Sequence, residues 1–240
     1  MIDKPTVLRQ KVLGWTVGLI VLLAVLLPLW ACHAKPQTQG AAGGASSAGT
    51  SAQVFTPPAD SGAAFDFYLL NLSWSPEFCY SHRDAPECAN HSTFVLHGLW
   101  PQNNNGSYPE KCSDAAGPAN PDAYKDIYPD AGLLQHEWQE HGTCSGLTPD
   151  QFFSNARTAF HSVVIPPMLN SLTAQISSSP DEILSSFTAA NPSIPRSSLA
   201  LSCGHNYLTA VEVCLDKSLR PTACGGVRSC RADSVRIPAP

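Results

Sequence analysis

Nine cysteines constrain the fold of this 240-residue chain more than any other feature of its sequence. Eight of them lie between positions 79 and 230, and the ninth, Cys32, follows an apolar segment near the N-terminus. An even number of cysteines behind an export signal is typical of disulfides formed in an oxidising compartment. Four disulfides are therefore predicted among Cys79, Cys88, Cys112, Cys144, Cys203, Cys214, Cys224 and Cys230.

The first 32 residues carry the export signal. Three basic residues between positions 4 and 11 precede an apolar run of 18 residues, 13–30, as in a secretory signal peptide. The run ends in LWAC, which resembles a bacterial lipobox and favours lipidation of Cys32. Two alternatives stay open: cleavage after Ala34, which discards Cys32, or an uncleaved membrane anchor, for which 18 residues are at the lower limit of length.

Residues 33–62 consist mostly of Ala, Gly, Ser, Thr, Gln and Pro, without aliphatic periodicity. Such a segment buries too little apolar surface to offset the entropy of ordering it, so we predict a flexible linker. Residues 63–240 have the size of one domain.

Charge limits how this chain could bind nucleic acid. From residue 33 onward there are 11 Lys and Arg (14 less the three before residue 12) and 18 Asp and Glu (19 less Asp3), a net charge of −7. Non-specific neutralisation of phosphates requires a basic surface. Any nucleic acid is therefore expected to bind in a local cleft.

Strand and helix patterns do not alternate regularly along residues 63–240. This favours an α+β domain over a doubly wound α/β fold. The stretch FVLHG is apolar on both faces, so its strand is expected to be central in the sheet. The expected elements are a strand from Ala64 to Pro76, a strand from Ser92, a long loop over 102–124, a helix over 133–141, a helix from Thr148 to Pro166, a short helix after Ser179 and a strand from Asn206.

The segment HEWQEHGTC, residues 136–144, looks like a zinc-protease motif with one residue too many. A zinc site on a helix needs histidines four apart, whereas His136 and His141 are five apart and diverge by about 140°. No third ligand follows at a recognisable spacing. We therefore expect no metal here.

The same helix would place four ionisable side chains on one arc, those of His136, Glu137, Glu140 and His141. Trp138 falls outside the arc, where it can pack in the core. Glu137 and His141 are four residues apart and are expected to hydrogen-bond, which would orient the imidazole and raise its pKa. The alternative is a solvated helix face with charges in chance positions.

A third histidine, His97, lies in the apolar stretch FVLHGLWPQ. Gly98 is expected to break the strand directly after it, and Trp100 offers an aromatic face on which a base could stack. A histidine in an apolar strand is more often a core residue, and that alternative stays open. Together with the helix histidines, His97 could complete the acid–base site of a hydrolase.

FVLHGLWPQ and HEWQEHGTC together resemble the two active-site segments of the ribonuclease T2 family. LNLSWSPEFC and YLTAVEVCLD also resemble that family, so the similarity runs from Phe65 to Cys230. The resemblance implies an α+β fold with a central antiparallel sheet flanked by helices. It also implies the disulfides Cys79–Cys88, Cys112–Cys144, Cys203–Cys230 and Cys214–Cys224.

The resemblance further implies an endoribonuclease that uses no metal or other cofactor. The ribose 2′-oxygen would attack its own phosphate and leave a 2′,3′-cyclic phosphate. By matching positions, His141 would be the general base, His97 the general acid, and His136 a phosphate-binding residue. Glu137 would stabilise the transition state, and Trp100 would stack on a base. Activity should be highest below neutral pH.

Two positions depart from the family pattern. Glu140 stands where the family usually has Lys, and a carboxylate there would repel the phosphate, so we expect a slow enzyme or one that needs a lower pH. A weakened homologue that only binds RNA or a protein partner is the alternative. Gln102 stands where some members carry an acidic base-selecting residue, which leaves the base preference open.

The expected setting is a bacterial periplasm or cell envelope. The expected partners are RNA as substrate and, through a lipid on Cys32 or an uncleaved anchor, the membrane. A secreted form is the alternative. The protein is expected to be a monomer without a stable protein partner.

Overall fold

The computed structural model describes residues 64–89 and 93–240 of the chain. The predicted signal segment (1–32), which includes Cys32, and the predicted linker (33–62) lie outside these residues. Among the helices of the described part, none has the length and apolar character needed to cross a membrane.

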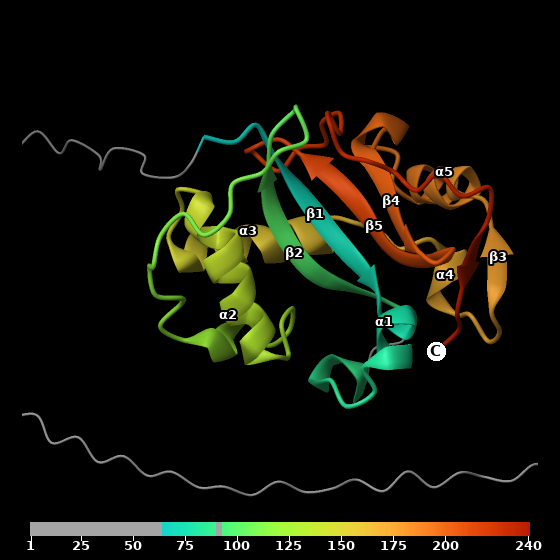
Figure 1. Ribbon diagram of the computed structural model, residues 1–240, viewed down its shortest axis with the longest axis horizontal. Helices are drawn as coiled ribbons and strands as arrows, with labels where there is room; N and C mark the ends of the chain where they lie inside the picture. The colour runs from blue at the N-terminus through green and yellow to red at the C-terminus, as the bar shows by residue number, and fades with distance from the viewer. Residues whose placement is uncertain (1–63, 90–92) are drawn as a thin grey trace, which may run out of the picture. The chain divides into compact units, whose positions relative to one another are not determined.

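The described part is an α+β fold, as predicted, built on one six-stranded sheet (Figure 1). The strands are β1 (Phe67–Trp74), β2 (Phe94–Gln102), β3 (Ile176–Ser178), β4 (Leu199–Gly204), β5 (Tyr207–Leu215) and β6 (Val235–Ile237). The α-helices are α1 (Ser75–Ser81), α2 (Ala131–Glu140), α3 (Pro149–His161), α4 (Pro167–Asn170) and α5 (Pro180–Ala190). Short 3-10 helices cover Pro86–Ala89, Pro121–Tyr124, Gly142–Cys144 and Arg196–Ser198.

The strand order is β2-β1-β5-β6-β3, and β4 pairs with β5 beside this path. The pairings are antiparallel except for one, in which Tyr207 of β5 lies parallel to Arg236 of β6. The sheet is therefore mixed rather than purely antiparallel. In Figure 1, α2 and α3 lie toward the β2 edge of the sheet, and α4 and α5 lie toward the opposite side.

The two faces of the sheet carry hydrophobic clusters of different size. Leu70 and Leu72 of β1 belong to the main core, together with Phe152 of α3. Leu69 of β1 belongs to a smaller cluster on the other face, against which Trp100 of β2 is partly buried. Because successive side chains of a strand point to opposite faces, this smaller cluster forms the floor of a second, more open side of the sheet. The candidate site lies there.

Two helices begin where their capping residues predict. Thr148 caps α3 and Ser179 caps α5, and in each case a capping box with the third helical residue satisfies free backbone N–H groups at the helix start. A proline follows each cap in the first helical turn, where its missing N–H costs nothing. Helix α3 ends at His161, earlier than the predicted Pro166.

Two strand predictions were wrong in detail. The first strand ends at Trp74 instead of Pro76, because Pro76 sits in the first turn of α1, a position that tolerates proline. The second strand is at the edge of the sheet and not central, since β2 pairs only with β1. Its apolar residues face the main core on one side and the smaller cluster on the other, which explains the apolar pattern without a second strand neighbour.

The four disulfides implied by the family resemblance are all formed. They are Cys79–Cys88, Cys112–Cys144, Cys203–Cys230 and Cys214–Cys224. A disulfide in a small exported domain typically contributes about 2–4 kcal/mol to stability. Three of the four tie loop segments to a strand or a helix end, so they stabilise parts of the chain that have little regular structure of their own.

Candidate active site

A β-bulge in β2 positions His97. Asn71 of β1 pairs with Gly98, but the next residue, Leu72, pairs with Leu96, so His97 is an extra residue without a partner on β1. In a regular strand, residues three apart point to opposite faces. The bulge reverses the alternation, so that His97 and Trp100 lie on the same face with ring centroids 5.2 Å apart. The prediction that the strand breaks at Gly98 was wrong, since β2 continues to Gln102.

Gly98 is required by close packing in this bulge. A Cβ atom at this position would overlap the carboxyl oxygen Oε2 of Glu137 and the indole nitrogen of Trp100. Those two atoms are hydrogen-bonded to each other, because Trp100 Nε1 donates to Glu137 Oε2 over 2.8 Å. Glycine at position 98 therefore allows strand β2 and helix α2 to approach closely enough for this bond to form.

Helix α2 divides its residues between the core and the cleft much as its helical arc predicts. Trp138 is buried, and its indole N–H donates to the carbonyl of Ala115 over 2.7 Å. His136 and Glu140 line an open cleft, and His141, which directly follows the last residue of the helix, lines it as well. Glu137 differs from its neighbours on the arc, because its side chain is fully buried beneath the cleft.

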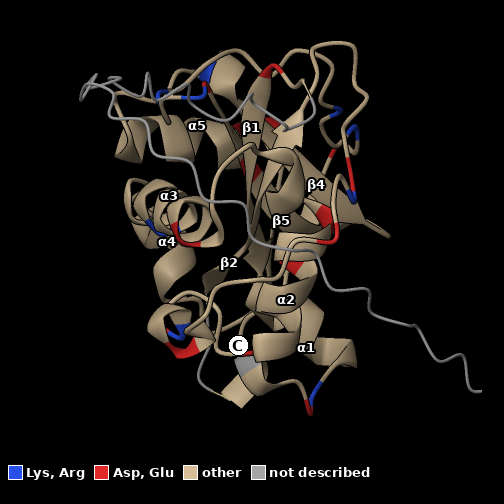
Figure 2. Cartoon of the chain, turned by 90° about the vertical axis from the view of Figure 1, so that its left-hand side faces the viewer, with Lys and Arg blue, Asp and Glu red and all other residues tan. Residues whose placement is uncertain are grey.

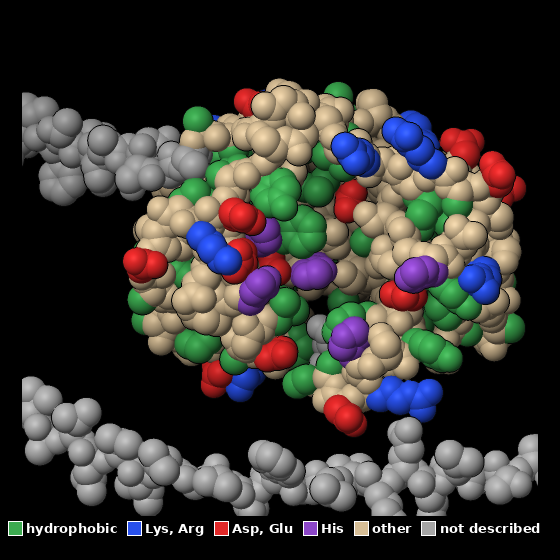
Figure 3. Space-filling view, viewed as in Figure 1, with side chains coloured by type: hydrophobic (Ala, Val, Ile, Leu, Met, Phe, Trp, Pro, Cys, Tyr) green, Lys and Arg blue, Asp and Glu red, His purple; other side chains and the backbone are tan. Residues whose placement is uncertain are grey.

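The cleft has a volume of about 420 Å³. Figure 3 shows histidine, acidic and hydrophobic side chains gathered on this face, with a basic side chain beside them. Its lining residues are Leu69, Trp100, Gln102, Tyr108, Glu110, His136, Glu140 and His141. The basic and acidic residues of the described chain are scattered in Figure 2 without a continuous basic stripe on the face it shows, which agrees with the negative charge of the sequence.

Glu137 contacts residues of β2 and not His141. Its Oε2 atom accepts the hydrogen bond from Trp100, and its Oε1 atom lies 3.7 Å from Nε2 of His97. The expected hydrogen bond between Glu137 and His141 was wrong: within the described residues, Oε1 of Glu137 and Nδ1 of His141 have no hydrogen-bond partner. The residue spacing on the helix permitted that bond, but the approach of β2 draws the carboxyl group toward the sheet.

Burial dominates the pKa values of the site. It raises the pKa of Glu137 to about 8, against the opposing effect of the Trp100 hydrogen bond, and nearby Glu140 raises it further. Burial lowers the pKa of His141 to about 4, and the positive charge of His136 adds to this effect. The predicted direction of the His141 pKa shift was therefore wrong, because burial of the imidazole and the charge of His136 outweigh the raising effect of Glu140.

His97 is partly exposed, with 42% of its side chain accessible, whereas the side chain of Glu137 beside it is fully buried. Partial burial and the charge of His136 lower the pKa of His97 below the ordinary value of 6.5. Its Nδ1 atom is hydrogen-bonded to the hydroxyl of Ser73 over 3.1 Å, which leaves Nε2 facing Glu137. His97 does not line the cleft itself but a neighbouring hollow, and Trp100 lies between this hollow and His141 in the contact sequence His97–Trp100–His141. The His97 ring is thus oriented by a residue of the neighbouring strand β1.

Several residues of the site were not found from the sequence, among them Ser73, Tyr108 and Lys111. Ser73 orients His97, Tyr108 lines the cleft, and Lys111 pairs with Glu140 through an Nζ–Oε1 distance of 3.3 Å. Ser73 faces the site because it lies on β1 beside the strand that carries His97, a relation that depends on strand register. Tyr108 and Lys111 belong to the long loop after β2, where no periodic pattern indicates direction.

Gln102 and Glu140 both line the cleft. Gln102 at the end of β2 is buried, with 8% of the residue accessible, and borders the cleft floor. Glu140 keeps 19% of its side chain accessible and turns its carboxylate toward Lys111. No group of three or more His, Cys, Asp or Glu side chains within 64–89 and 93–240 has the arrangement of a metal site.

Comparisons with known proteins place the chain in a family. The model of the ribonuclease T2 family matches residues 65–224, and the chain belongs to this family. It is 38% identical over 136 residues to a ribonuclease of Aeromonas hydrophila and 31% identical over 182 residues to a probable ribonuclease of Haemophilus influenzae. Those matches cover 56% and 68% of this chain but only 53% and 62% of the two relatives. Ribonuclease DdI of Dictyostelium discoideum is 31% identical over 202 residues, 73% of this chain and 85% of that protein.

Solved structures share the fold at lower identity. An RNase-related protein from Calystegia sepium superposes with a TM-score of 0.61 at 24% identity and covers 72% of this chain and 97% of its own. A ribonuclease from bitter gourd seeds superposes with a TM-score of 0.58 at 22% identity, covering 71% and 99%. At this level of identity the structures establish the fold alone.

Proposed function

We propose that this protein is a metal-independent endoribonuclease that cleaves RNA through a 2′,3′-cyclic phosphate. The observation that carries the proposal is that two imidazoles, those of His97 and His141, both pack against Trp100, with ring centroids about 5 Å from the indole. Cleavage by the neighbouring 2′-hydroxyl needs proton transfer at two oxygens, and two imidazoles in opposite protonation states supply it. Membership of the ribonuclease T2 family supports the same reaction.

His141 acts as the general base and His97 as the general acid. The lowered pKa of His141, about 4, keeps its ring neutral in mildly acidic solution, as a base requires. It removes the proton of the 2′-hydroxyl while that oxygen forms its bond to phosphorus. His97 donates a proton from Nε2 to the 5′-oxygen as the bond between that oxygen and phosphorus breaks. The products are a cyclic phosphate and a 5′-hydroxyl.

Glu137 acts as a neutral carboxylic acid. With a pKa of about 8 it keeps its proton below neutrality, so it does not repel the phosphate. Its Oε2 atom accepts from Trp100, and its buried Oε1 atom lies 3.7 Å from Nε2 of His97, so the acid favours the transition state by positioning these two residues. His136 binds the phosphate from the helix surface, and Trp100 contributes its ring face to a base.

Incubation of the purified protein with RNA in excess EDTA tests the proposed function. Cleavage that leaves 2′,3′-cyclic phosphate ends is expected. Chelator-sensitive cleavage contradicts the metal-independent mechanism. RNA that is bound but not cut favours the second candidate, a homologue that only binds, for which the carboxylate of Glu140 inside the cleft is the motivating observation.

The pH dependence of kcat/KM should be bell-shaped with its maximum between about 4 and 6.5. The acidic limb arises because His141 gains a proton near pH 4 and can no longer act as a base. The alkaline limb arises because His97, whose pKa lies below 6.5, loses the proton that it must donate. Initial rates on a dinucleotide substrate from pH 3.5 to 8 measure both limbs, since kcat/KM reports the free enzyme. A maximum above pH 7 contradicts these assignments.

We further propose that the protein is exported by a bacterium and acts as a monomer in the periplasm or as a lipoprotein of the cell envelope. Four disulfides support an oxidising compartment. Attachment through Cys32 is favoured over secretion and over an uncleaved anchor, and mass spectrometry of the mature N-terminus tests it. A mature chain that starts at residue 35 contradicts lipidation.

A further inference from the structure

The basic side chains on the walls of the cleft are, among the described residues, the two histidines His136 and His141. Among the described residues that line it, two are carboxylates, Glu110 and Glu140, and none is Lys or Arg. An RNA phosphate that enters the cleft therefore meets negative charge at its rim, which opposes binding and opposes the charge that develops during cleavage. Besides His136, a cation is supplied by Lys111, which follows Glu110 in the chain and pairs with Glu140.

The Lys111 side chain is held by Glu140 without being buried. Its Nζ atom lies 3.3 Å from Oε1 of Glu140, while 69% of the lysine side chain remains accessible. An ammonium group has three N–H donors, and one contact to a carboxylate leaves donors free. Lys111 does not itself line the cleft, but Glu140, which holds its ammonium group, lines it beside His136 and His141.

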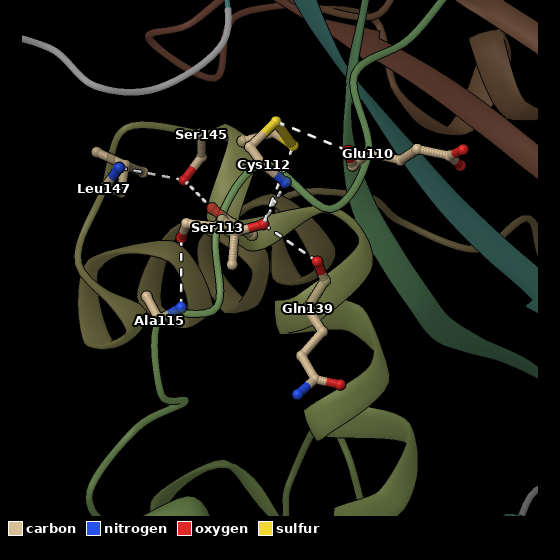
Figure 4. Close-up of a disulfide and its surroundings, with 10 residues drawn as sticks. Glu110, Cys112, Ser113, Ala115, Gln139, Ser145 and Leu147 are labelled. Atoms are coloured by element: carbon tan, nitrogen blue, oxygen red, sulfur yellow. Dashed lines mark hydrogen bonds between the residues drawn. A yellow bond between two sulfur atoms is a disulfide. The ribbon is translucent and has the colours of Figure 1, made fainter.

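The backbone of Lys111 is fixed as well. Lys111 has a φ of 51°, in the left-handed region that residues other than glycine seldom adopt. Its N–H donates to the carbonyl of Glu140 over 3.0 Å, and the next residue, Cys112, is bonded to Cys144. Figure 4 shows this segment against the end of α2, where the N–H of Cys112 donates to Thr143 Oγ1 over 3.1 Å.

We propose that Lys111 is the residue that contacts the substrate phosphate at the mouth of the cleft, and that Glu140 positions it. The inference rests on the proposed function and names a further residue of that site. Lys111 arises from a loop, yet two backbone attachments and an ion pair direct its side chain toward the helix end. Glu140 is thereby neutralised, and the positive charge lies on the solvent side, where an incoming phosphate meets it first.

A double-mutant cycle tests both parts of the proposal. Lys111→Gln should lower kcat/KM for RNA about tenfold, less than the roughly 10²–10³-fold loss of a buried donor, because the ammonium is largely exposed. In the Glu140→Gln background, Lys111→Gln should lower kcat/KM by only about threefold. In that background the Lys111 ammonium group is no longer held by Glu140, so it contributes less before it is removed. Lys111→Arg should retain most of the activity. Lys125→Gln, which removes an exposed cation paired with Asp122 elsewhere, should have no effect and is the matched control.

Two outcomes overturn the proposal. If Lys111→Gln has no effect in the Glu140→Gln background, the lysine only neutralises Glu140 and does not contact phosphate. If the cost is equal in both backgrounds, Glu140 does not position the lysine.

Binding of inorganic phosphate, measured by calorimetry, separates this inference from the proposed function. Weaker phosphate binding by Lys111→Gln than by Lys125→Gln supports the role of Lys111 even in a protein that cuts no RNA. Equal binding by the two variants contradicts that role even where RNA is cleaved.

Discussion

Replacement of His97 by alanine should lower kcat/KM for RNA by about 10²–10⁴-fold, the range expected for the loss of a general acid. The residual activity should no longer fall between pH 5 and 7, because the group responsible for the alkaline limb is absent. The free energy of unfolding should change by less than about 1 kcal/mol, since the His97 side chain is 42% accessible and has no strand partner. Steady-state rates across pH and urea unfolding measure the two effects separately.

His161→Ala is the matched control for this prediction. His161 is exposed at the end of α3 and does not line the cleft, so its removal should leave the rate unchanged. A His97→Ala variant with normal activity contradicts the assignment of the acid. A variant that loses activity and stability together indicates instead that His97 supports the bulge.

Gly98→Ala should damage stability and activity together. The added methyl group would overlap the Trp100–Glu137 contact. Overpacking typically costs about 1–3 kcal/mol, and leaving a buried carboxyl without its partner costs about 1–3 kcal/mol more. Activity should fall by about tenfold or more in the fraction that stays folded, because Trp100 and the carboxyl of Glu137 are displaced from their places at the cleft. Thermal unfolding and rates at a temperature well below the transition measure both.

Gly204→Ala provides the comparison. Gly204 ends β4, and a Cβ atom there meets only Thr209 at an ordinary 3.4 Å. This variant should keep the stability and rate of the parent protein. If Gly98→Ala behaves in the same way, strand β2 and helix α2 are not as close as the Trp100–Glu137 hydrogen bond indicates.

Local patterns explain which parts of the fold could be predicted. The starts of α3 and α5 depend on Thr148 and Ser179, whose capping contacts lie within three residues in sequence. The division of α2 between core and cleft follows from helical geometry, which is why burial of Trp138 was expected correctly. Sequence position alone contains this information because the interacting groups are less than one helical turn apart.

The remaining features of the site depend on contacts between distant segments. The bulge at His97 is defined by the register between β1 and β2, which no single strand reveals. The partner of Glu137 is Trp100, 37 residues away, and not the His141 suggested by the helix. The directions of the pKa shifts follow from burial, and burial arises only when the sheet, the helix and the loop come together. A prediction based on neighbouring charges alone therefore gave the wrong sign for the pKa shift of His141.

The bulge has a consequence for how β2 can change during evolution. His97 is the one residue of the strand that the ladder with β1 skips, so any side chain can occupy the position without altering the pairing. Deletion of the residue is also compatible with the ladder, because Leu96 and Gly98 pair with the adjacent residues Leu72 and Asn71 and would then follow each other as in a regular strand. Leu99 and Trp100 would keep their faces. The proposed general acid is therefore an insertion that the sheet does not need, so the chemistry can be lost by substitution or by deletion while the architecture of the sheet is kept.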